Sequence, residues 1–255
     1  MAKVVLALLV FALTAFVWRA YPTLRARMPD DFQKLSGPER VARARAAREA
    51  VIREKYEKAG VQYPGEIFLR WFKHEAQLEL WARSGAGPFR LIATYPILKS
   101  SGGPGPKRRE GDRQVPEGFY IVDRFNPESL YHLSLGLDYP NAADRIHADP
   151  KRPGGDIFIH GKDVTIGCAP LGDEAIEEVY LAALDLRAVT GRKIEVHLFP
   201  ARMSGPGWES FAAQSSKHAA FWAELKPAYD AFERTRLVPK VSVTPKGRYL
   251  IEPAK

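Results

Sequence analysis

The chain has 255 residues, 45% of them hydrophobic and 11% aromatic, which is enough for one large domain or two small ones with a proper core. A formal charge of +8 favours polyanionic surroundings such as nucleic acid, phospholipid head groups or an acidic wall polymer. The single cysteine, Cys168, excludes an intramolecular disulfide framework and a cysteine-rich zinc module. It is a buried small side chain, a residue without a role, or a nucleophile.

The N-terminal segment predicts export across a bacterial cytoplasmic membrane. An uncharged apolar run extends from Val4 to Trp18 and matches the apolar core of an export signal. As a helix this run would be about 22 Å long, shorter than a bilayer core of about 30 Å. Arg19 and Tyr21 fit poorly next to a signal-peptidase cleavage site. The segment is therefore either a cleaved signal or an uncleaved membrane anchor. We expect residues 1–25 to be this signal or anchor and to contact the membrane, with the remainder extracytoplasmic, in the periplasm.

A helix is predicted next, over residues 37–59. Ser36 to Glu39 fit a capping box with an early proline, and Gly60 is a typical helix stop. The apolar stripe of this helix is thin. We therefore expect a solvated helix within a helical linker over residues 26–62, which would act as a spacer near the membrane. We interpret its basic residues as a solvent-exposed face.

From Glu66 the apolar period changes to two, which predicts a strand-rich catalytic domain over residues 63–255. Strands are expected over residues 66–72, 77–82, 89–95, 119–125, 131–137, 156–160 and 193–199. Two helices, over residues 173–190 and 217–236, and a hairpin over residues 240–252 complete the pattern. Runs of strands with helices inserted late indicate an α+β fold built on a sheet sandwich.

The chemistry concentrates in the segment that ends at Cys168. An apolar strand ends at His160, and the chain turns at Gly161. A short loop then leads back through Gly167 to the cysteine. This path can bring imidazole and thiol within hydrogen-bond reach, and an imidazole lowers the pKa of a neighbouring thiol and carries its proton. The backbone N–H groups of Gly167 and Cys168 are the candidate oxyanion hole, and Asp173 is interpreted as a helix N-cap. A packed cysteine and a structural histidine are an equally good interpretation of these residues alone.

Two motifs carry a resemblance to a known family. Residues 111–120, Gly-Asp-Arg-Gln-Val-Pro-Glu-Gly-Phe-Tyr, resemble the GD-x-x-TPEG-x-Y motif of YkuD-type L,D-transpeptidases. The segment from His160-Gly161 to Gly167-Cys168 looks like their active-site signature. More narrowly, the chain is similar to the YafK-like branch of murein L,D-transpeptidase-related proteins, over roughly Tyr63 to Tyr249.

The resemblance implies covalent catalysis on the stem peptides of peptidoglycan. Cys168 would attack the carbonyl that joins an L-centre of diaminopimelate to a D-residue and form a thioester, with His160 as base and then acid. An acceptor amine would resolve the thioester in a transpeptidase, and water in a hydrolase. Some members of the branch are associated with release of a lipoprotein from the wall, so the sequence leaves the choice open.

The chain departs from the family pattern at two positions. Ile166 stands where a second histidine is usual, and Pro170 replaces an arginine two residues beyond the cysteine. Arg145 and Arg202 are candidate substitutes for binding a substrate carboxylate, although both are equally good structural ion-pair partners. Gly161 and Tyr139 complete the candidate substrate-binding residues, with a core or strand-edge position as the stronger interpretation of Tyr139.

Other functions are less well supported by the sequence. A metal hydrolase needs three or four converging ligands, whereas the six histidines are scattered without ligand spacing, so no metal or other cofactor is expected. Nucleic-acid binding does not fit an exported chain whose basic residues lack aromatic interleaving. A non-catalytic wall-binding protein is the remaining alternative.

Overall fold

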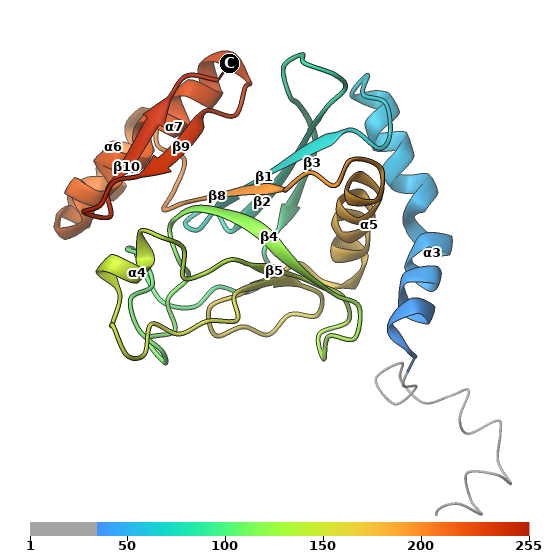
Figure 1. Cartoon of the computed structure of the whole chain (residues 1–255), viewed down its shortest axis with the longest axis horizontal. Helices are drawn as coiled ribbons and strands as arrows, with labels where there is room; N and C mark the ends of the chain where they lie inside the picture. The colour runs from blue at the N-terminus through green and yellow to red at the C-terminus, as the bar shows by residue number, and fades with distance from the viewer. Residues whose placement is uncertain (1–34, 255) are drawn as a thin grey trace, which may run out of the picture. The chain divides into compact units, whose positions relative to one another are not determined.

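The computed structural model of the protein describes residues 35–254. The signal or anchor expected over residues 1–25, and the expected linker as far as residue 34, lie outside the described residues. Residues Gly37–Lys255 form one compact unit (Figure 1). In the described part of the chain, no helix has both the length and the apolar character that a membrane span requires.

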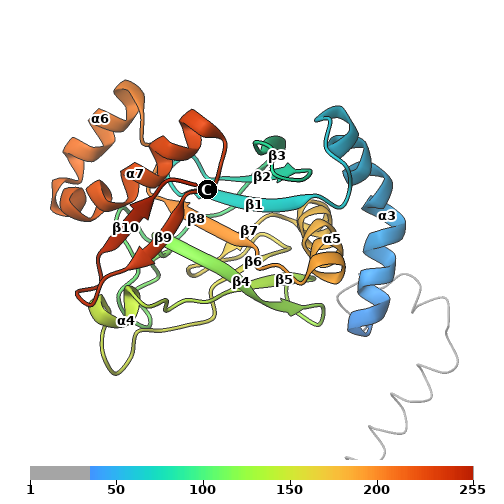
Figure 2. The same ribbon diagram turned by 45° about the horizontal axis from the view of Figure 1, so that its top comes forward.

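The first described helix, α3 (Gly37–Lys58), has the predicted range but is not a solvated spacer. It lies beside α5 (Asp173–Thr190) in both views of the ribbon (Figures 1 and 2). Three residues of its apolar stripe, Ala44, Ile52 and Tyr56, are at most 1% exposed and belong to the main hydrophobic core. The helix is therefore packed onto the folded domain that was expected to begin at residue 63.

Charged side chains explain why this thin stripe is sufficient. Nζ of Lys55 lies 2.5 Å from Oε2 of Glu178, and Nη2 of Arg45 lies 2.6 Å from Oδ1 of Asp185. Both acids lie on α5. The basic residues that the sequence suggested to be a solvent-exposed face therefore contribute to the contact between the two helices. Long basic side chains of this kind cover apolar surface with their stems while their charged ends pair.

The strands form one eight-stranded mixed sheet and a separate hairpin. Their order in the sheet is β3-β2-β1-β8-β4-β5-β6-β7, and the pairs β1–β8 and β6–β7 are parallel. The sheet strands are β1 (Glu66–Phe72), β2 (Gln77–Arg83), β3 (Arg90–Pro96), β4 (Gly118–Asn126), β5 (Ser134–Leu137), β6 (Phe158–His160), β7 (Ala169–Pro170) and β8 (Glu195–Phe199). The predicted α+β class is confirmed, and the predicted strands all occur within a few residues of their expected positions.

The sheet curls so that its two ends meet. The backbone N–H of Leu98, just beyond β3, donates to the carbonyl of Pro170 in β7 at 2.9 Å. Alternate residues of the strands and one side of α5 fill the enclosed space with the main hydrophobic core. The opposite face of β5, β6 and β7 is therefore not part of this core.

A second layer covers the other face of β1 and β8 (Figure 2). It consists of α6 (Gly205–Gln214), a 3₁₀ turn (Ser216–His218), α7 (Ala219–Thr235) and the hairpin of β9 (Lys240–Val243) and β10 (Tyr249–Glu252). The sequence predicted α7 and the hairpin but not α6, because α6 contains two glycines and a proline in its first turn, which are weak helix formers. A one-turn helix, α4 (Asp144–His147), was also not predicted.

Candidate active site

Two adjacent strands bring the predicted nucleophile and base together. In the parallel pair of β6 and β7, Ile159 lies opposite Ala169 and His160 opposite Pro170, so Cys168 lies beside Phe158. Strands about 4.8 Å apart, with a rise of about 3.3 Å per residue, place residues that are two positions out of register about 8 Å apart at Cα. Since Ile159 and Ala169 face the core, their neighbours His160 and Cys168 share the opposite face. Imidazole and thiol therefore project from one face of the sheet at neighbouring positions.

The imidazole of His160 is held in one tautomer. Its Nδ1 lies 2.6 Å from the carbonyl oxygen of Gly161, and a carbonyl only accepts, so Nδ1 carries the proton. Nε2 is then the unprotonated nitrogen of the neutral ring. The ring of Tyr131 lies over the imidazole with centroids 4.8 Å apart, and His160 is 1% exposed. This burial lowers the pKa of His160, so the ring is neutral at neutral pH and can act as a base.

Cys168 is half-buried, and its sulfur contacts the backbone of the strand beside it. The N–H of Phe158 donates to Sγ at 3.4 Å, and Sγ lies 3.5 Å from the carbonyl oxygen of Asp156. Burial raises the pKa of the thiol, while the Phe158 hydrogen bond acts in the opposite direction and favours the thiolate. The resting pair is therefore a neutral thiol and a neutral imidazole, and the thiol must lose its proton as it attacks.

Thr165, which the sequence did not single out, organises the turn into the cysteine. Its Oγ1 accepts from the N–H groups of Cys168 at 2.7 Å and Gly167 at 3.1 Å, and donates to the carbonyl of Cys168 at 2.8 Å. The two N–H groups predicted as an oxyanion hole thus already have an acceptor, which a substrate oxyanion must displace. Gly167 has a φ of +139°, and a Cβ there would lie 3.2 Å from the carbonyl oxygen of Gln114, so only glycine fits this position.

Asp173 has a different role from the one expected. The N-cap of α5 is Gly172, and Asp173 is the first helical residue. Its carboxylate accepts from the backbone N–H of Lys162 at 2.9 Å and pairs with Nζ of Lys162 at 3.0 Å. This carboxylate ties down the start of the loop between His160 and Cys168.

The three predicted substrate-binding side chains outside this loop lie in different surroundings. Arg202 donates through Nη2 to Gln77 at 2.9 Å and Glu79 at 2.7 Å, which favours the structural interpretation of this arginine. Tyr139 is 5% exposed and donates to the carbonyl of Pro153 at 3.0 Å, as expected of a core residue. Arg145 lies exposed on α4. Their roles toward a substrate stay predictions.

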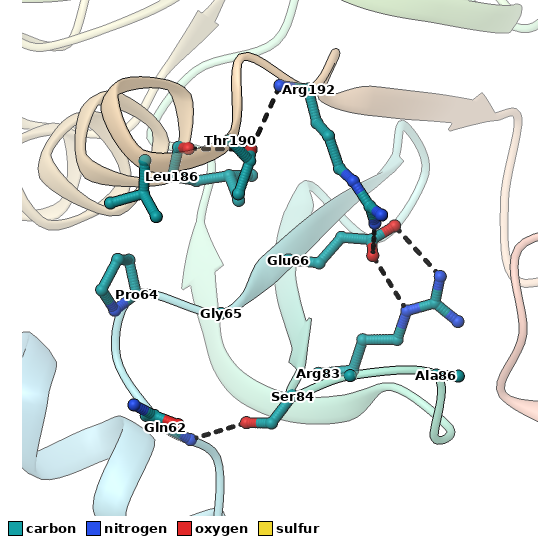
Figure 3. A pocket seen from close by; sticks show the side chains of 12 residues that line it. Gln62, Pro64, Gly65, Glu66, Arg83, Ser84, Ala86, Leu186, Thr190 and Arg192 are labelled. Carbon is teal, nitrogen blue, oxygen red and sulfur yellow. Dashed lines mark hydrogen bonds and ion pairs between the residues drawn. The ribbon is translucent and has the colours of Figure 1, made fainter.

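A cavity of about 620 Å³ lies elsewhere, where β1 begins and α5 ends (Figure 3). Arg83 and Arg192 both point to Glu66 in its wall, with ion-pair distances of 3.1 and 2.5 Å. The two cations are thereby engaged, and none of the lining residues belongs to β6 or β7. Among residues 35–254, no group of three or more His, Cys, Asp and Glu side chains is placed to hold a metal ion.

Comparisons with known proteins identify the family of the chain. Residues 67–196 match the YkuD family, described as an L,D-transpeptidase catalytic domain. The chain is 36% identical over 187 residues to proteins named "Putative L,D-transpeptidase YafK" in Escherichia coli K12 and O157:H7, and the match covers 72% of this chain and 73% of each relative.

Similar solved structures are more distant. The helical cell shape determining protein Pgp2 from Campylobacter jejuni is 18% identical, with 76% of this chain and 80% of that chain covered and a TM-score of 0.42. Bd1075 from Bdellovibrio bacteriovorus is 20% identical, with 66% and 60% covered and a TM-score of 0.38.

Proposed function

The chain belongs to the YkuD family of L,D-transpeptidase catalytic domains and is YafK-like, and from this membership we propose that it is an enzyme that cleaves and rejoins peptidoglycan stem peptides through Cys168. The observation that carries the proposal is the placement of Cys168 and His160 on one face of adjacent strands, with Nε2 of His160 free to accept a proton. Family membership gives the class of reaction, and this geometry supports the cysteine as its nucleophile.

The first half of the reaction forms the acyl-enzyme. As Sγ of Cys168 attacks the carbonyl carbon that links an L-centre to a D-residue, its proton passes to Nε2 of His160. The carbonyl oxygen becomes an oxyanion and replaces Thr165 Oγ1 as acceptor of the N–H groups of Cys168 and Gly167. The C–N bond then breaks, Nε2 returns the proton to the leaving amine, and a thioester remains on Cys168.

The second half removes the acyl group. An acceptor amine attacks the thioester, gives its proton to Nε2, and expels the thiolate, which takes that proton back. Water in place of the amine gives hydrolysis, with the same steps and a free carboxylate as product. Because the resting thiol and imidazole are both neutral, substrate binding rather than a standing ion pair triggers the attack.

We also propose that the enzyme works outside the cytoplasmic membrane, because an apolar run precedes the folded unit and peptidoglycan lies in that compartment. A fusion of residues 1–36 to a reporter that is active only after export tests this placement. Cytoplasmic retention of the reporter would contradict it.

The activity is tested with purified protein and defined muropeptides, with products identified by mass spectrometry. We expect cross-linked or D-amino-acid-exchanged products for a transferase, and shortened or released peptides for a hydrolase. Either activity should be lost in Cys168→Ala and His160→Gln, should be abolished by iodoacetamide, and should survive EDTA. A wild type that forms neither kind of product, or a fully active Cys168→Ala variant, would overturn the proposal.

A further inference from the structure

An arginine that no motif marks lies in the same row of the sheet as the nucleophile. Arg124 on β4 pairs with Gly136 on β5, and Gly136 pairs with Phe158 on β6. Phe158 lies beside Cys168 and donates its N–H to Sγ. Residues in register on neighbouring strands project from the same face, so Arg124 shares a face with the cysteine. The next residue confirms this orientation, because Phe125 packs against the opposite face, in the main core.

Gly136 allows the arginine to extend toward the cysteine. A Cβ at Gly136 would lie 2.8 Å from Nε of Arg124, so any side chain at this position would displace the guanidinium. With glycine there, the guanidinium crosses β5, and its Cζ lies 4.9 Å from the centroid of the Phe158 ring. An aromatic face is a favourable platform for a cation. The side chain therefore ends over the residue that contacts Sγ.

The guanidinium has three partners: Nε lies 3.1 Å from Oδ1 of Asp123, Nη2 donates to the carbonyl of Leu137 at 3.4 Å, and Nη1 pairs with an exposed carboxylate at the site. Nη1 of Arg124 lies 2.9 Å from Oδ1 of Asp156, and the Asp156 side chain is 81% exposed. The carbonyl oxygen of the same residue lies 3.5 Å from Sγ of Cys168. A solvent-exposed ion pair is weak, so another carboxylate can replace it at little cost. The fork of an arginine suits such a carboxylate.

We propose that Arg124, Gly136 and Phe158 form a carboxylate-binding subsite beside Cys168, in which Asp156 holds the arginine until a substrate carboxylate takes its place. This proposal rests on the proposed function for the identity of the substrate, because stem peptides carry free carboxylates next to the bonds that the enzyme would cut.

The subsite is tested first by alkylation of Cys168, which is the only thiol in the chain. Iodoacetate and iodoacetamide react in the same way: Sγ bonds to the methylene carbon and iodide leaves. Only iodoacetate carries a carboxylate, so the ratio of the two rates reports on a cation beside Sγ without any need for turnover. Removing one charge-assisted contact should lower this ratio about tenfold in Arg124→Gln. In Asp156→Asn the ratio should rise, because the competing carboxylate is absent.

Arg187→Gln is the matched control. Its guanidinium also lies 4.9 Å above a phenylalanine ring, that of Phe125, but on the helical side of β4. We expect the wild-type ratio in this variant, and unchanged unfolding midpoints in all three variants. A change in the thiolate fraction of Cys168 alters the rates of both reagents alike and therefore cancels in the ratio. An unchanged ratio in Arg124→Gln would overturn the subsite, and an unchanged ratio in Asp156→Asn would overturn the exchange with Asp156.

A second assay separates the subsite from the proposed function. Muropeptides with a free or an amidated carboxylate at the D-residue are compared, and Arg124→Gln should lose about tenfold or more in kcat/KM for the free form only. If the wild type is active but Arg124→Gln discriminates as the wild type does, the subsite is wrong and the function stands. If no muropeptide reacts but the alkylation ratio falls as expected, the function is wrong and the subsite stands.

Discussion

The substitution Lys73→Met removes the cation from a buried polar network and should destabilise the fold strongly. Nζ of Lys73 donates to Oε1 of Glu117 at 2.8 Å and to the carbonyls of Gly105 at 2.7 Å and Val115 at 3.0 Å. Glu117 is fully buried, and it also accepts from Nε1 of Trp222 at 2.7 Å. The network thus joins the end of β1, two points of the segment between β3 and β4, and α7.

The magnitude follows from what methionine leaves behind. Met has about the length of Lys, so the cavity is small and the main cost is the carboxylate of Glu117, which stays buried without its cation. Breaking a buried ion pair on one side typically costs about 3–5 kcal/mol. The double variant Lys73→Met/Glu117→Gln buries no charge, so it should lose less than the single variant, with a coupling energy of about 1–3 kcal/mol.

Urea unfolding, followed by the fluorescence of Trp222 and the other tryptophans, measures these changes. With a urea slope of about 2–3 kcal/mol per molar, the midpoint of Lys73→Met should fall by roughly 1–2.5 M. The control is Lys226→Met, which breaks an exposed pair with Asp230, where both side chains are about 40% exposed, and should cost about 1 kcal/mol or less. If Lys73→Met falls no further than Lys226→Met, or if the double variant is the less stable one, the reasoning from burial is refuted.

Three further predictions concern the site and the core. Burial raises the pKa of the Cys168 thiol and lowers that of His160. The rate of alkylation by iodoacetamide should therefore rise with pH through a pKa above the ordinary thiol value of about 8.5. A rate that is already maximal near neutral pH would contradict a neutral resting pair. Thr165→Val leaves two N–H groups without their acceptor and should lower the free energy of unfolding by about 1–3 kcal/mol, whereas Thr165→Ser keeps the hydroxyl and should stay near the wild type in the same urea assay. Burial also lowers the pKa of His197, so the folded state binds fewer protons than the unfolded state. The free energy of unfolding should therefore be retained above about pH 6.5 and fall as the pH drops below it. Between about pH 6.5 and 5, His197→Phe should lose less of this free energy than the wild type. Equal acid sensitivity of the wild type and His197→Phe would contradict that assignment.

The parts of the fold that depend on local pattern were predictable. Residues 173–190 carry a helical apolar stripe and a glycine stop, and α5 occupies that range with Gly191 in the left-handed conformation after it. The alternation from Glu66 onward predicts the strands for the same reason. The packing of α3 was not predictable, because two basic side chains that suggest a solvated surface, Arg45 and Lys55, pair with acids more than 120 residues away.

The site shows the same division between local and distant information. His160 and Cys168 stand out because glycines bracket them within one short segment, and a shared motif adds to that signal. Arg124 does not stand out, since its place beside Phe158 depends on the register of three strands, which no local pattern specifies. Thr165 offered a local clue, because a hydroxyl two or three residues before a tight turn often accepts backbone N–H groups.

The edge of the sheet at β7 limits how a peptide can approach the cysteine. This strand is two residues long, its second residue is a proline without an N–H, and the carbonyl of that proline is taken by Leu98. Strand addition, by which many domains recognise extended peptides, needs a row of free donors and acceptors along an edge. A ligand therefore cannot dock beside Cys168 as a ninth strand. It must be recognised through side chains and loops, which do not require the regular L-configured backbone that a β-ladder demands.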